Sequence, residues 1–294
     1  MTDITKLFCN IDDFWKNFEP LYKEKLINAG KREPKRKAGL SLSEVMTIIV
    51  LFHIFGYRNF KTFYNGFVSK YLRDKFPNLP SYNRFVELKQ STVFPLHCYL
   101  MAIAGKSTGI AFVDSTSLKV CHPKRIRSHK VFKNIAKRGK TSTGWFYGLK
   151  LHMIVNDRGE ILALMISAGN VDDRQPVPDM CKNVIGKLVG DKGYISKKLF
   201  NELMEHGVQL ITKIKKNMKN KLMPFIDKLI LRKRGIIETI FDQLKNISQI
   251  EHSRHRSPIN FLVNLFGGLI AYSLQPKKPS LKLSKSALNL LELN

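Results

Sequence analysis

The sequence predicts a mixed α/β fold behind a helical region, on three observations. Apolar residues follow helical spacing through residues 1–104, and short apolar runs typical of strands begin after residue 109. Strands and helices then alternate, which favours a sheet flanked by helices. The small residues at 105–109 separate the two patterns, so we expect a domain boundary there.

Residues 1–104 are predicted to form several helices. Ser41–Glu44 has the pattern of a capping box and precedes an apolar run. Aromatic residues between Phe60 and Leu72 recur at steps of three and four, which indicates a helix with one aromatic-rich face. We expect this face in the core rather than as a platform for bases. The basic run 31–37 is typical of a helical DNA-binding module and equally of a solvated linker.

After residue 109 the predicted order is three strands, a helix, a strand, a helix, a strand and a helix. The expected members are strands ending at Asp114 and Asp191, strands at 146–155, 160–167 and 208–214, and helices at 173–184, 196–204 and around Glu238. This order matches the ribonuclease-H-like α/β fold, a mixed five-stranded sheet with flanking helices, preceded here by an all-helical region. The expected domains are a helical DNA-binding domain at 1–104, a catalytic domain at 105–275 and a basic tail at 276–294.

Three acids stand out within these elements. Asp114 and Asp191 each follow a short apolar run, where an acid either lies at the mouth of a sheet or caps a turn. Glu238 lies on an amphipathic helix, and Arg234 and Lys245 share its face because four and seven residues are about one and two turns. Acids from two strand ends and one helix could converge on two divalent cations, and hard carboxylate ligands suit Mg²⁺ or Mn²⁺.

The charge favours a polyanionic partner. The 294 residues include 50 Lys and Arg against 23 Asp and Glu, a net charge of +27. Residues 122–144 hold eight Lys and Arg, and we expect this segment to be a loop or insertion that faces phosphate through residues such as Lys124, Arg125 and Arg127. Five lysines at 213–221 form a second basic run.

Neither a disulfide framework nor a membrane anchor is expected. The four cysteines are scattered without a CxxC pair, which suits a reducing cytoplasm and disfavours a zinc site. Residues 1–15 lack the basic start and apolar core of a signal peptide. The apolar stretch 259–274 is short for a membrane span and contains Asn260 and Asn264, so a buried helix is expected.

Three motifs together resemble the DDE transposases of bacterial insertion sequences. They are Val113–Thr116, then Gly190–Tyr194 with the letters GDKGY, and then Arg234 followed by Glu238 and Lys245 at spacings of four and seven. The resemblance covers about residues 105–275, and a helical amino-terminal region is also usual in that family. The family pattern places a tyrosine three residues before the arginine, where this sequence has Leu231.

The resemblance implies a metal-dependent transposase that cuts DNA and transfers strands at the ends of an insertion sequence. Asp114, Asp191 and Glu238 would hold two Mg²⁺ ions, and Arg234 and Lys245 would contact DNA phosphate unless they only form ion pairs along the helix. A homodimer in the DNA complex and a cytoplasmic, nucleoid-associated location in a bacterium follow from the same likeness.

Other roles and functions stay open from the residues. Tyr194 would stack on a sugar or base, with a place in the core as the alternative. Asp172 and Asp173 are expected to cap a helix. The alternative functions are a metal-dependent nuclease of the same fold and a catalytically inactive DNA-binding derivative.

Overall fold

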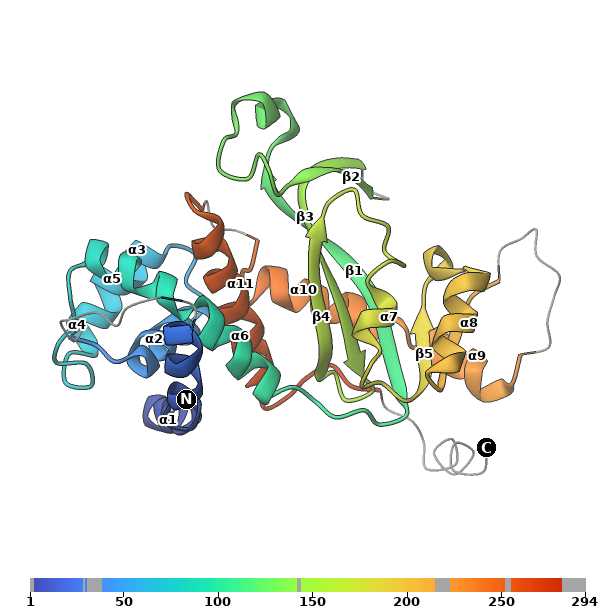
Figure 1. The fold of residues 1–294 in the computed structure, drawn as a ribbon, viewed down its shortest axis with the longest axis horizontal. Coiled ribbons are helices and arrows are strands. Elements are labelled where there is room, and N and C mark those ends of the chain that lie inside the picture. Colours follow the sequence, from blue (N-terminus) through green and yellow to red (C-terminus); the bar gives the residue numbers. More distant parts are fainter. Residues whose placement is uncertain are drawn as a thin grey trace. The chain divides into compact units, whose positions relative to one another are not determined.

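The structure, a computed structural model, forms two compact units (Figure 1). It describes residues 3–28, 30, 39–141, 144–214, 223–251 and 255–281. The helical unit comprises residues 1–103 and 244–274, and the sheet unit comprises 104–243 and 275–294. Residues 244–274, which the sequence suggested would belong with the sheet, therefore group with the amino-terminal helices. The basic run 31–37 lies outside the described residues.

Helices build the helical unit throughout its described part. They are α1 (Ile4–Asn28), α2 (Leu42–Ile54), α3 (Phe60–Phe63), α4 (Ser69–Tyr71), α5 (Tyr82–Leu88), α6 (Val93–Ala102) and α11 (Pro258–Ser273), with a 3₁₀ turn at Lys89–Thr92. The predicted capping box begins α2: the Ser41 hydroxyl accepts from the Glu44 amide (3.1 Å), and the Glu44 carboxylate accepts from the Ser41 amide (2.7 Å). Both bonds satisfy amides that the first helical turn leaves unpaired.

The aromatic-rich segment forms a helical run from Phe60 to Tyr71, with a π-turn at Tyr64–Val68 between α3 and α4. Phe63 and Tyr64 are buried, and the Tyr64 ring lies 4.7 Å from the ring of Phe85, centroid to centroid. The first part of the aromatic face therefore lies in the core, as predicted, whereas Tyr71 at its end is 69% exposed.

Helix α11 is the predicted apolar helix, and it is buried along most of its length. It packs against α2 and α6, and Figure 1 shows it in red beside them. A Cβ on Gly267 would lie 2.7 Å from Ile49 and 3.0 Å from His53, so glycine allows these helices to approach closely. No helix in the described ranges is both long and apolar enough to cross a bilayer.

The sheet unit contains a mixed sheet of six strands among its described residues. They are β1 (Ile110–Cys121), β2 (Lys137–Thr141), β3 (Gly144–Asn156), β4 (Ile161–Ala168), β5 (Gly186–Gly190) and β6 (Val208–Thr212). The order is β2-β3-β1-β5-β6, with β4 also on β3. Strand β1 is antiparallel to β3 and parallel to β5, and β5 is parallel to β6. The α/β class with a mixed sheet is therefore confirmed.

The predicted count of five strands was wrong because β2 lies in the basic segment that was expected to be a loop. β2 pairs with the first residues of β3, and β4 pairs with the rest of β3. The two short strands thus lie end to end along one edge of a long strand. Pairing with β3, rather than any apolar pattern of its own, holds β2 as a strand.

Helices cover the sheet and complete its core. They are α7 (Val177–Met180), α8 (Lys197–Glu205), α9 (Phe225–Arg232) and α10 (Gly235–Asn246), and α10 runs from the sheet unit into residues assigned to the helical unit. Ser196 caps α8 as predicted. The helix expected at 173–184 is only one turn long. Pro178 lacks the backbone donor that a helix beginning at 173 would need at this position, so the helix begins later.

The last described residues of the chain return to the sheet unit. The Leu281 amide donates to the carbonyl of Asp157 (2.6 Å), next to the turn between β3 and β4. A Cβ on Gly159, whose φ is 72°, would lie 2.1 Å from the Pro279 carbonyl oxygen, so only glycine fits beneath this segment. Of the predicted basic tail, residues 282–294 lie outside the described part, as do residues 215–221 of the lysine run.

Candidate active site

Asp114 lies within β1 rather than at its end. The strand continues to Cys121, and Asp114 faces Met153 across the pair of β1 and β3. The predicted strand end was wrong because residues 115–121 lack an apolar run but are held by their pairing with β3. The Asp114 side chain is 21% exposed, and its Oδ1 accepts from the Ser115 amide (2.8 Å).

Asp191 directly follows β5, the parallel neighbour of β1, so this acid does lie at a strand end. Its Oδ1 accepts from the Gly193 amide (2.7 Å) in the 3₁₀ turn Lys192–Tyr194. A Cβ on Gly193 would lie 2.9 Å from this oxygen, so glycine leaves room for the contact. The sequence GDKGY thus folds into a tight turn that fixes one carboxylate oxygen.

The guanidinium group of Arg234 contacts both Asp114 of β1 and Glu238 of α10. Its Nη1 lies 3.1 Å from Asp114 Oδ2, and its Nη2 is hydrogen-bonded to Glu238 Oε1. Arg234 immediately precedes α10, and Glu238 is one turn further along. The ion pair with Glu238, the structural alternative for Arg234, is therefore present, and it extends to Asp114.

The electrostatics of Asp114 show that the acids influence each other. Burial is the main cause that raises the pKa of Asp114 to about 6, and the negative charge of Asp191 contributes to this rise. The Ser115 amide and the Arg234 guanidinium act in the opposite direction. A buried carboxylate close to a second one favours binding of a cation, because a cation would relieve both the burial and the repulsion.

Tyr194 lies in the core of the sheet unit, which corrects its expected role in stacking on DNA. It is 2% exposed, and its ring lies so close to Gly190 that a Cβ there would meet ring carbons at 3.0 and 3.1 Å. Its hydroxyl has no hydrogen-bond partner among the described residues. Burial raises its pKa, and the charges of Asp114, Asp173 and Asp191 act in the same direction, so the hydroxyl is a neutral donor near the acids.

A polar network beside Asp114 was missed in the sequence. Asp173 Oδ1 accepts from Ser115 Oγ (2.8 Å) and from Lys150 Nζ (2.9 Å), and His152 Nδ1 lies 3.8 Å away. Asp173 was expected only to cap a helix. The signal was present in β3, where Lys150 and His152 interrupt an otherwise apolar strand. Two such side chains on one face of a central strand indicate a buried polar site.

The remaining predicted residues are either paired with another residue or exposed. Lys245 pairs with Glu251 at 3.0 Å, and both belong to the helical unit. Lys124, Arg125 and Arg127 lie on an exposed 3₁₀ turn at Pro123–Ser128. All eight Lys and Arg of the basic segment are exposed, so they are available to a partner.

The acids fit a divalent cation by their chemistry, although they are not gathered into a ready site. Within the described part of the chain, no three His, Cys, Asp or Glu side chains are close enough to hold a metal ion. The carboxylate oxygens suit Mg²⁺ or Mn²⁺, and the repulsion between Asp114 and Asp191 favours a cation near them. Arg234 now supplies positive charge between Asp114 and Glu238.

Comparison with known proteins places the chain in a family. The Transposase DDE domain family matches residues 104–258, which is more than half of the 294 residues. No curated protein matches. One similar solved structure is the piggyBac transposase synaptic complex with hairpin DNA, at 13% identity and a TM-score of 0.46, covering 99% of this chain and 77% of that one. With its acids in the matched segment, the chain belongs to the DDE transposases.

Proposed function

We propose that this transposase cleaves DNA and transfers strands at the ends of an insertion sequence, using Asp114, Asp191 and Glu238. The observation that carries the proposal is the Arg234 guanidinium, which contacts Asp114 and Glu238 together, while Asp191 acts on Asp114 through its charge. Asp114 and Glu238, which are distant in the sequence, thus meet at Arg234. The mixed sheet with β1 between β3 and β5 supports a ribonuclease-H-like assignment for this unit.

The three acids would hold divalent cations, which supply Lewis-acid activation of a nucleophile and stabilisation of the leaving oxygen in phosphoryl transfer. The chain's own groups position the acids. The Gly193 amide orients Asp191, the Ser115 amide orients Asp114, and Arg234 provides a planar donor suited to a phosphate or carboxylate. The Tyr194 hydroxyl offers one further donor beside them.

DNA is the proposed partner because of charge and exposure. The basic segment at 122–144 presents eight exposed Lys and Arg on the sheet unit. Residues 1–104 carry a smaller excess of positive charge, and we propose that this part recognises sequence. Joining two element ends requires two active sites, so we propose a homodimer in the DNA complex.

Replacing the acids tests the function. Asp114→Asn, Asp191→Asn and Glu238→Gln should each lower Mg²⁺-dependent cleavage of supercoiled DNA by at least about 10³-fold, because each loses a charged metal ligand. DNA binding should persist. Asp179→Asn is the matched control, since Asp179 of α7 is exposed and pairs only with the exposed Lys182 in the ion pairs of the described residues. Normal cleavage by Asp191→Asn would contradict the assignment, and cleavage without joining would make the protein a nuclease.

Salt dependence tests the contribution of the basic segment. The logarithm of the binding constant should fall with the logarithm of salt by about 0.9 per phosphate contact. Replacing Lys124, Arg125 and Arg127 with alanine should therefore flatten the slope by up to about 2.7. An unchanged slope would show that this turn faces solvent in the complex.

A further inference from the structure

Trp145 is a large aromatic side chain that the sheet unit leaves exposed, at 64% of its surface. It lies near the start of β3, directly opposite Lys140 of β2. The Lys140 ammonium lies 5.7 Å from the centre of the indole ring, a cation–π contact. Arg138 lies two residues before Lys140 on the same strand and so on the same face. The hairpin therefore presents an indole on β3 beside two cations on β2.

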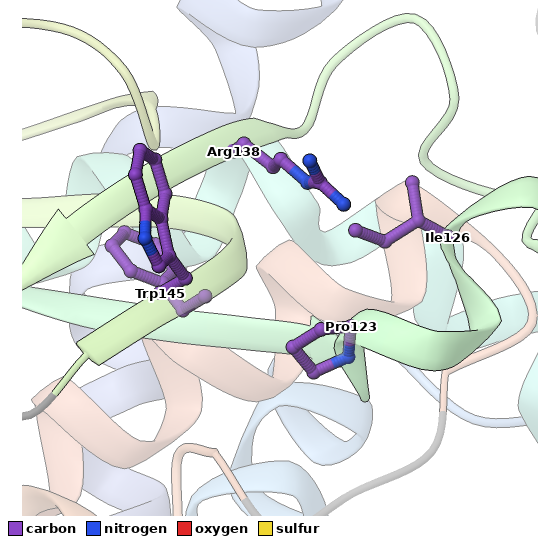
Figure 2. A pocket seen from close by; sticks show the side chains of 5 residues that line it. Pro123, Ile126, Arg138 and Trp145 are labelled. Atoms are coloured by element: carbon purple, nitrogen blue, oxygen red, sulfur yellow. The ribbon is translucent and has the colours of Figure 1, made fainter.

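The indole also forms one wall of a cavity of about 220 Å³ (Figure 2). The cavity is lined by Pro123, Ile126, Arg138, Trp145 and Phe146. Figure 2 shows the Arg138 side chain extending toward Ile126, with Trp145 and Pro123 at other edges. Arg138 forms no ion pair with any residue that the structure describes, so the cavity combines apolar walls with an available guanidinium.

A second, open groove of about 460 Å³ runs from this wall to residues that neighbour two of the acids. It shares Arg138 and Trp145 with the cavity and extends to Asp173 and Gly193. Gly193 donates to Asp191, and Asp173 accepts from Ser115 beside Asp114. A DNA strand bound along this groove would therefore pass from the neighbours of Asp114 and Asp191 to the indole.

We propose that the Trp145 cavity binds an unpaired base of DNA lying in this groove. The proposal rests on the proposed function in DNA cleavage. A base offers a flat π-face to the indole and polar edges to Arg138, which matches a cavity with one cation and four apolar or aromatic walls. The other seven exposed basic side chains of the same segment would hold the adjoining phosphates. An uncharged apolar ligand would not account for them.

The test compares two DNAs with equal phosphates. One is a duplex with a thymine overhang, and the other is the same duplex with an abasic overhang. The full chain should bind the thymine overhang about 10-fold more tightly, because stacking one base on an aromatic ring is worth this much. Trp145→Ala should bind both equally, and Trp145→Phe should retain part of the preference. Phe225→Ala, which removes another exposed aromatic of the sheet unit, should retain all of it.

Fluorescence provides a second measurement. The chain has two tryptophans, so a Trp15→Phe protein reports only Trp145, whose emission should be quenched by the thymine overhang and not by the abasic one. An undiminished preference in Trp145→Ala, or equal binding of both DNAs by the unaltered protein, would overturn the base site alone. Failure to bind either DNA would contradict the proposed function and this site together.

Discussion

Buried tyrosines distinguish the two units. In the helical unit, the Tyr64 hydroxyl donates to the Pro80 carbonyl (2.8 Å) and the Tyr99 hydroxyl donates to Asn10 (2.5 Å). In the sheet unit, the Tyr194 hydroxyl is equally buried but has no partner among the described residues. An unpaired buried hydroxyl lowers stability, so the sheet unit tolerates a cost that these helical tyrosines avoid. The three tyrosines therefore differ in the partner of the hydroxyl and not in burial.

Buried ionisable groups add a second contrast. Burial lowers the pKa of His53 in the helical unit to about 4, and His53 Nδ1 donates to the Ser248 carbonyl (2.6 Å). Burial raises the pKa of Asp114 in the sheet unit to about 6. Acidification therefore disfavours the native state through His53 and favours it through Asp114. Burial also lowers the pKa of His152 to about 4, which partly offsets Asp114 within the sheet unit.

The largest expected loss of stability would come from breaking the aromatic packing around His53 in the helical unit. Phe52 is 2% exposed and lies against the rings of His53, Phe60 and Phe63. Phe52→Ala should lower the free energy of unfolding by about 3–5 kcal/mol, because it leaves a cavity in the core. Denaturant unfolding would measure this change.

Phe55→Ala on the same segment is the control for Phe52→Ala. Phe55 is 38% exposed, so its loss should cost less than about 1 kcal/mol. Equal losses for the two variants would show that the aromatic core does not support the helical unit.

The next effect concerns pH and His53. Its folded-state pKa of about 4 lies below the ordinary value of 6.5. The neutral His53 therefore makes its full contribution to the free energy of unfolding above pH 6.5. That contribution is lost as the pH falls from 6.5 to 4, at a total of about 3 kcal/mol. In His53→Gln the unfolding free energy should depend less on pH across this window. The exposed His206→Gln should keep the original dependence, and a similar flattening there would contradict the role of His53.

The smallest expected changes in the free energy of unfolding come from two variants that each remove one tyrosine hydroxyl. Tyr99→Phe should lower the free energy of unfolding by about 1 kcal/mol, because the bond to Asn10 is lost. Tyr194→Phe should raise it by about 1 kcal/mol, because an unpaired buried hydroxyl is removed. Thermal and denaturant unfolding would give both signs, and a loss of stability in Tyr194→Phe would show that its hydroxyl is paired in solution.

Features that depend on neighbouring residues could be predicted from the sequence. Ser41 and Ser196 cap helices through contacts three residues away, and both were found as expected. The aromatic spacing from Phe60 onward likewise placed one face in the core. The three acids could be selected from the sequence because each stands in a short motif. The contact of Arg234 with both Asp114 and Glu238 could not be predicted.

Features that depend on distant contacts could not be predicted. β2 exists because β3 is long enough to pair with it, and Asp114 lies inside a strand for the same reason. Helix α11 packs against α2, although about 200 residues of sequence separate the two helices. No local sequence pattern reveals this contact. Tyr194 is buried because Gly190 makes room for its ring, a relation between side chain and backbone that spacing alone does not show.

The position of Asp114 inside β1 also determines which acid can move. Its backbone belongs to a ladder that runs on both sides of it, from Ala111 to Cys121, so displacing it would require breaking strand pairing. Asp191 is tethered by one amide of a short turn, and Glu238 extends from a helix. Any adjustment of the spacing between the acids would therefore arise mainly from Glu238 and Asp191. Hydrogen exchange should be slowest at the amides around Asp114, the fixed reference point of the site.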